Sequence, residues 1–144
     1  MKIVPFKKEH IKKLMDLEPN YRRLFYGTKQ HYLKSFPEKQ NVWTGLDDNN
    51  RIVGCSGVYE LWKEVGEGWL LASNLIRNHP ITTVKTMKQN LNMLMKKYKR
   101  IQIVVQNKFP EGMKFALMLG FKPEGLMVRY GPDGRDYMRM ARTR

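Results

Sequence analysis

The sequence has few of the residues that build disulfides, zinc clusters or membrane spans. Of its 144 residues, one is cysteine and three are histidine, so an internal disulfide is excluded and a zinc cluster is disfavoured. The longest apolar runs, such as Trp69 to Ala72, hold four or five residues, whereas a bilayer span needs roughly 20. The first ten residues lack the apolar stretch of a secretory signal. These absences predict a cytoplasmic protein with a reduced thiol, no metal and no membrane partner.

Acidic residues are also scarce. Thirteen Asp and Glu stand against 27 Lys and Arg, which gives a formal net charge of +14. The segment from Gly68 to Pro110 contains no Asp or Glu. In the segment from Asn41 to Glu67, acidic residues outnumber basic ones. Such a balance points to anionic partners. Two interpretations stay open: a solvated basic face, or a site for phosphates or nucleic acid. No motif typical of nucleic-acid-binding proteins supports the nucleic acid.

The pattern of apolar residues predicts one mixed domain over residues 1–144. Apolar residues make up 42% of the chain, enough for a core, and no repeat or linker divides it. Gly66 to Gly68 is interpreted as a turn. Apolar positions repeat every three or four residues in predicted helices at His10–Leu17, Asn20–Tyr26, Lys29–Phe36, Pro80–Tyr98 and Pro110–Leu119. Short β-rich runs predict strands at Lys2–Phe6, Asn41–Leu46, Arg51–Leu61, Trp69–Ser73, Arg100–Val105, Gly125–Tyr130 and Arg135–Ala141.

This order of elements resembles the GCN5-related N-acetyltransferase (GNAT) superfamily along the whole chain. The strand Ile101–Val105, the helix Glu111–Leu119 and the turn Leu119-Gly120-Phe121 resemble the late part of that fold. Phe115–Phe121 and Tyr130–Gly134 also resemble short GNAT-like proteins of tailed phages. The resemblance implies an α/β (α+β) fold: a mixed, bent sheet of six to seven strands flanked by about four helices. A phage origin would place the protein in the host cytoplasm or in the virion.

The resemblance also implies a site for acetyl-CoA. In the family a splayed strand receives the pantetheine arm, and here Leu71, Ala72 and Ser73 take its place. The next loop wraps the pyrophosphate at a helix N-terminus, where free N–H groups favour an anion. Arg77 matches the first position of that loop, and Pro80 and Thr82 replace its two glycines. The implied cofactor-binding residues are Leu71, Ala72, Ser73, Arg77, Ile81, Thr82 and Thr83.

Candidate catalytic residues follow from the same resemblance. A general base is expected on the third or fourth strand or in an adjacent loop. Glu67, in the predicted turn, and Glu60, on the preceding strand, are the candidates by location, and Tyr130 is a lesser one. Ala116 stands where many family members have a tyrosine that protonates the leaving thiolate. Because a free thiol has a pKa of about 8.5, this loss weakens catalysis without forbidding it. The plainer interpretation of Glu67 is a solvent-exposed carboxylate beside a turn.

Two functions fit these observations. The first is transfer of an acetyl group from acetyl-CoA to an amine of a small molecule or protein. The second is a catalytically silent GNAT-fold protein that serves as a phage accessory or virion-assembly component, with phage structural proteins or another anionic molecule as its partner. Fold alone does not decide between them, because function depends on the residues of the site.

Overall fold

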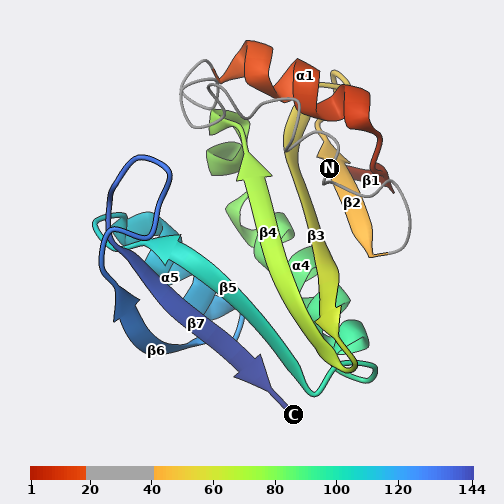
Figure 1. Ribbon diagram of the computed structural model, residues 1–144. Coiled ribbons are helices and arrows are strands. Elements are labelled where there is room, and N and C mark those ends of the chain that lie inside the picture. The colour runs from red at the N-terminus through yellow and green to blue at the C-terminus, as the bar shows by residue number, and fades with distance from the viewer. Residues whose placement is uncertain (19–40) are drawn as a thin grey trace. The chain divides into compact units, whose positions relative to one another are not determined.

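The computed structural model describes residues 1–18 and 41–144 of the chain. They form a mixed seven-stranded sheet in the order β1-β2-β3-β4-β5-β7-β6 (Figure 1). Strands β4 and β5 pair in parallel, and the pairs β1–β2, β2–β3, β5–β7 and β6–β7 are antiparallel. The predicted mixed sheet of six to seven strands is confirmed. The strands are β1 (Lys2–Pro5), β2 (Val42–Leu46), β3 (Ile52–Trp62), β4 (Val65–Ala72), β5 (Arg100–Gln106), β6 (Lys122–Met127) and β7 (Tyr137–Thr143).

Three α-helices and one 3-10 helix accompany the sheet in the described residues. They are α1 (Lys8–Leu17), η1 (Asn74–Asn78), α4 (Pro80–Leu94) and α5 (Pro110–Met118). The helices predicted over Asn20–Tyr26 and Lys29–Phe36 lie outside the described residues. Pro80 begins α4, where its missing N–H costs no helical hydrogen bond.

The chain divides into two compact units. The first comprises Met1–Gly57 and Leu70–Pro80, and the second comprises Val58–Trp69 and Ile81–Arg144. Each unit is built from two separate stretches of sequence, and β3 and β4 each contribute residues to both. A single domain over residues 1–144 stays a prediction, and so does the bend of the sheet.

The first unit buries one face of α1. Ile11, Leu14 and Met15, spaced three and four residues apart, are almost fully removed from solvent, which is the pattern of an amphipathic helix. His10 on the same helix lies with its Nδ1 2.8 Å from the Thr44 Oγ1 on β2. The helix is therefore held by apolar packing and by a buried polar contact.

The second unit is organised around β5. All seven residues of this strand pair with β7, and Ile101 and Met140 are fully buried. Helix α5 ends at the predicted place: Gly120 has a φ of +93°, and the N–H of Phe121 donates to the Ala116 carbonyl at 3.1 Å. With the Gly120-to-Leu117 bond, this is a Schellman motif.

The predicted turn at Gly66–Gly68 is wrong. The chain turns at Lys63 and Glu64, and Glu64 adopts a positive φ of 64°. The glycines instead lie inside β4 because a side chain would not fit there. A Cβ on Gly66 would come within 2.6 Å of the Val58 Cγ1, and one on Gly68 within 3.0 Å of the Ile103 Cγ2. Glycine in this segment thus marks close packing rather than a change of chain direction.

Candidate functional site

Glu67 is a buried carboxylate in the middle of the second unit. It lies on β4 beside Gln102 of β5, and 9% of the residue is exposed. The Arg139 Nη1 donates to both of its carboxylate oxygens, at 2.8 and 3.0 Å. Glu67 is therefore an ion-paired, largely desolvated group, and its interpretation as an exposed carboxylate beside a turn is wrong.

Strand register explains why Glu67 and Arg139 meet although 72 residues separate them. Arg139 on β7 pairs with Val104 of β5, while Glu67 pairs with Gln102 of β5. Residues two apart on a strand point to the same side of a sheet, so the side chains at 102 and 104 share a face. The carboxylate and the guanidinium thus reach each other across one face of β5.

A second ion pair lies on the neighbouring strands. The Arg100 Nη1 donates to the Glu124 Oε2 at 3.0 Å, and the Arg100 Nε donates to the Gln102 Oε1 at 3.0 Å. The hydrogen bond from Arg100 lowers the pKa of the Glu124 carboxyl, and the charge of Arg139 acts in the same direction. The bond to Glu124 likewise raises the pKa of Arg100, to which Glu67 adds a smaller contribution. These two pairs are coupled electrostatically and sum to zero charge.

The other two predicted catalytic residues, Glu60 and Tyr130, make no hydrogen bond or ion pair with Glu67. Glu60 is exposed on β3, and no hydrogen bond or ion pair joins it to another of the described residues. Tyr130 lies in the β6–β7 loop, not in a strand as predicted; it is 52% exposed, and its ring meets that of Tyr137 edge-on at 5.9 Å. Of the three predicted groups, only Glu67 is held in place by a half-buried, hydrogen-bonded partner.

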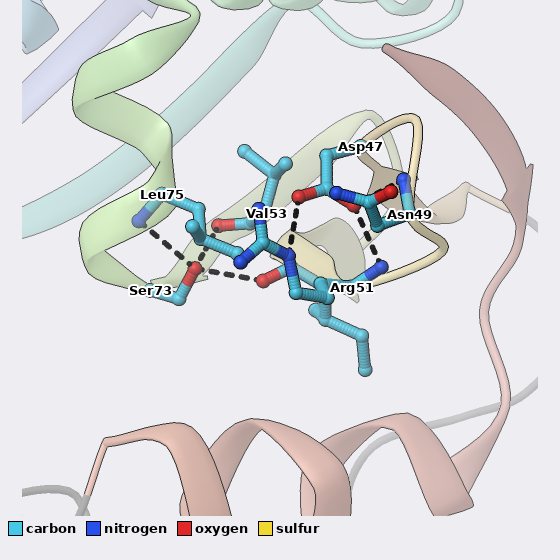
Figure 2. A network of polar contacts seen from close by, with 7 residues as sticks. Asp47, Asn49, Arg51, Val53, Ser73 and Leu75 are labelled. Atoms are coloured by element: carbon cyan, nitrogen blue, oxygen red, sulfur yellow. Dashed lines mark hydrogen bonds and ion pairs between the residues drawn. The ribbon is translucent and has the colours of Figure 1, made fainter.

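Ser73, one of the predicted cofactor-binding residues, supports the backbone of the first unit (Figure 2). Its hydroxyl donates to the Ile52 carbonyl at 2.7 Å and accepts from the Leu75 N–H at 3.3 Å. It therefore joins the end of β4 to β3 and caps η1. Leu71 and Ala72 precede it on β4 and are half-buried, and Arg77 is exposed in η1.

The remaining predicted cofactor-binding residues belong to the first turn of α4. Ile81 is 81% exposed, Thr82 is exposed and Thr83 is buried. The first N–H groups of an α-helix have no carbonyl partner within the helix, so this turn offers amide donors. Pro80 contributes none.

Two further polar groups of the first unit were not predicted as a site. Asp47 accepts from the Arg51 Nε and from the Asn49 N–H at 2.8 and 2.9 Å (Figure 2), which closes the turn between β2 and β3. Cys55 is fully buried, and burial raises the pKa of its thiol to about 11. A thiol in this state is a poor nucleophile, which agrees with its expected role as a small buried residue.

The sequence did not reveal Arg139 as the partner of Glu67. Arg139 bonds to Glu67, while Arg142 bonds to the Leu119 carbonyl at 3.2 Å. The sequence offered one signal: an isolated acid and an arginine lie in or beside strands that are expected to be central. This signal identifies a pair only when the register of the strands is known.

The described parts of the chain contain neither a metal centre nor a spanning helix. In residues 1–18 and 41–144, no group of three or more His, Cys, Asp or Glu side chains is arranged to hold a metal ion. No helix in the same ranges combines the length and the apolar character needed to cross a membrane.

The fold is that of N-acetyltransferases. A single-residue variant of the spermidine N-acetyltransferase SpeG from Vibrio cholerae matches with a TM-score of 0.73 and 13% identity, over 99% of this chain and 95% of that one. Ard1 from Thermoplasma volcanium matches with a TM-score of 0.77 and 14% identity, over 99% and 96%. A GNAT-family acetyltransferase from Bacillus anthracis matches with a TM-score of 0.70 and 13% identity, over 98% and 93%.

Sequence comparison adds nothing to this. No protein-family model and no curated protein matches the chain. At these identities the likeness to solved structures establishes the GNAT fold, and function is argued from the residues of the site.

Proposed function

We propose that this protein is an acetyl-CoA-dependent N-acetyltransferase that acts on an amine of a small molecule or protein. The observation that carries the proposal is the buried carboxylate of Glu67 on β4 of a GNAT fold, which Arg139 of β7 holds. A thioester is already activated, so the protein has to bind the donor, orient the amine and remove its protons. Among the residues that the structure describes, Glu67 is the group best placed for the last task.

Glu67 acts as the general base. An amine is protonated at neutral pH and nucleophilic only after it loses a proton, which the Glu67 carboxylate accepts directly or through a water. Arg139 donates to both oxygens of the carboxylate and so holds it in place. The amine nitrogen then forms a bond to the acetyl carbon as the bond to sulfur breaks, and the thiol leaves with a proton. Ala116 has no proton to give, so the thiolate takes its proton from solvent.

The residues proposed for the donor fit acetyl-CoA in part. The amides of Ile81, Thr82 and Thr83 at the start of α4, together with Arg77, supply hydrogen-bond donors and positive charge suited to a pyrophosphate. Leu71, Ala72 and Ser73 supply the strand for the pantetheine arm. Pro80 has no N–H, so this pyrophosphate-binding site has fewer amide donors than the glycine loop of the family. Acetyl-CoA supplies the acetyl group when bound.

Thiol release in the presence of acetyl-CoA and a panel of amines tests the proposal. A general base contributes roughly 100- to 10,000-fold to the rate, so Glu67→Gln is expected to lower kcat by that factor. Glu60→Gln is the matched control, because Glu60 is an exposed carboxylate one strand away. Equal activity of wild type and Glu67→Gln would remove Glu67 from the mechanism.

Binding of the donor is tested separately by thermal unfolding. A ligand at a hundred times its Kd stabilises by about 2.7 kcal/mol, so acetyl-CoA is expected to raise the Tm of the wild type. Arg77→Ala is expected to remove most of that rise. If millimolar acetyl-CoA leaves the Tm unchanged, the protein does not use this donor.

A silent GNAT-fold protein is the second candidate. The observation in its favour is that both oxygens of Glu67 are already engaged by Arg139, in a chain that lacks the loop glycines and the family tyrosine. In this case the protein binds a partner, such as a phage structural protein or another anionic molecule, without turnover. No thiol release with any amine, together with no response to acetyl-CoA, is the result that this candidate predicts.

A further inference from the structure

Arg139 uses only part of its guanidinium in its contact with the protein. Its contact with Glu67 is made through Nη1 alone. By contrast, Arg100 bonds through all three of its nitrogens, and Arg142 and Arg144 each bond through Nη1 and Nη2. Within the described ranges, no acceptor contacts the Nε or the Nη2 of Arg139.

The unused edge of Arg139 is the one best suited to an anion. The N–H groups of Nε and Nη2 point in parallel and match the two oxygens of a carboxylate. The side chain is 20% exposed, and neither of these nitrogens is a buried donor, so both can be reached from solvent. A ligand can therefore bind them without displacing a protein acceptor. The geometry therefore describes a fork that a ligand can occupy while Nη1 stays on Glu67.

We propose that Glu67 and Arg139 together bind the acceptor as a zwitterion, and that this acceptor is an α-amino acid. Its carboxylate takes the Nε and Nη2 edge of Arg139, and its ammonium donates to Glu67. In an α-amino acid the two charged groups are attached to one carbon, so they fit an acid and a base that already touch each other. This inference rests on the proposed acetyl transfer and names the substrate class of the same site.

The charges around the pair favour such a ligand. Glu67 and Arg139 cancel each other, and the adjacent Arg100 and Glu124 cancel as well. A neutral zwitterion preserves this balance when it enters, whereas a simple amine brings one uncompensated positive charge into a desolvated region. Arg139 is thus a specificity-determining residue, and Glu67 is both a binding group and the base.

The transfer step is balanced for this acceptor. The ammonium gives one proton to Glu67, and the resulting amine forms the C–N bond to the acetyl carbon while the C–S bond breaks. The nitrogen then loses its second proton, the thiolate gains one, and Glu67 returns the other to solvent. The products are an N-acetyl amino acid, free thiol and one proton. Arg139 stays on the carboxylate throughout and takes no part in the bond changes.

The test compares α-amino acids with amines that lack only the carboxylate, for example L-leucine with 3-methylbutylamine and L-phenylalanine with 2-phenylethylamine. Thiol release gives kcat/KM for each member of a pair, and the ratio within the pair cancels any loss of folded protein. Hydrogen bonds to a charged group are worth about 1.5–3 kcal/mol, so wild type is expected to prefer the amino acid by about 10- to 100-fold.

Two variants of Arg139 distinguish its role in substrate preference from a general loss of folded protein. Arg139→Gln is expected to bring the ratio close to one, and Arg139→Lys to retain part of the preference, because the charge remains while the fork is lost. Arg142→Gln on the same strand is the control and is expected to keep the wild-type ratio, since its bonds go to Leu119 and Asn92. If Arg139→Gln does not fold, the wild-type ratio alone decides.

The outcomes distinguish this inference from the proposed function. Equal kcat/KM for amino acids and their matched amines overturns the zwitterion proposal and leaves acetyl transfer standing. If no turnover is seen with any acceptor, calorimetry without acetyl-CoA measures whether amino acids bind. Heat of amino-acid binding in the wild type that disappears in Arg139→Gln supports the ligand class and refutes the enzyme. No turnover and no heat with any member of the panel overturns both.

Discussion

Alkaline pH should remove the contribution that the buried Cys55 thiol makes to the stability of this protein. Burial raises the pKa of the Cys55 thiol from 9.0 to about 11, against a smaller opposing effect of the Thr44 hydrogen bond. The folded state therefore holds the thiol proton more tightly than the unfolded state does. This contribution to stability is fully present below about pH 9 and is lost as the pH rises through about 11. The loss should be about 1.4 kcal/mol at about pH 10 and roughly 2.3 kcal/mol at about pH 11.

Urea unfolding of wild type and Cys55→Ala at about pH 8 and about pH 10 measures this term. Lysines and tyrosines also titrate in this range, but they are present in both proteins and cancel in the difference. Cys55→Ala should be less stable at the lower pH, because it leaves a small cavity, and this deficit should shrink by about 1.3 kcal/mol at the higher pH. A deficit that stays constant between the two pH values would refute the assignment of Cys55 as a buried, protonated thiol.

Three further stability predictions come from single contacts. Gly66→Ala places a methyl group 2.6 Å from the Val58 Cγ1 and should cost about 1–3 kcal/mol in urea unfolding, whereas Gly125→Ala meets nothing within 4 Å and should be nearly neutral. Ser73→Ala removes the hydroxyl that bonds to the Ile52 carbonyl and should cost about 1 kcal/mol, measured as a lower Tm. Arg139→Met leaves the Glu67 carboxylate desolvated and unpaired and should cost about 2–4 kcal/mol; the double variant with Glu67→Leu should recover part of this, and strictly additive losses would contradict the pairing.

Local patterns predicted the helices of the second unit well. The three- and four-residue spacing of apolar residues after Pro80 predicted α4. The predicted end was four residues too late, because the last apolar residues, Met95 and Tyr98, lie in the turn that follows the helix. Gly120 gave the end of α5, since a positive φ at that position is what glycine permits. These features depend on neighbours in sequence, and for that reason the sequence alone contains them.

Features that depend on distant strands were not predictable in the same way. Gly66 and Gly68 have the composition of a turn, and their place inside β4 follows from Val58 and Ile103 on adjoining strands. Of the candidate catalytic groups, Glu67 was placed in the predicted turn Gly66–Gly68, so neither its position on β4 nor its burial and its partner was predicted. The Arg139 contact requires the register of β4, β5 and β7 together, which no local spacing specifies.

The interleaved course of the chain limits how this protein can be divided in the laboratory. Because the stretches Val58–Trp69 and Leu70–Pro80 belong to different units, no single cleavage yields both units whole. A fragment that begins at Val58 keeps the second unit but also carries Leu70–Ala72, a strand segment deprived of its neighbours in the first. A fragment that ends at Pro80 keeps the first unit and carries the segment with Glu67, without Arg139. Unpaired strand edges of this kind promote aggregation, so experiments on separate halves would report on the exposed edges rather than on the folded units.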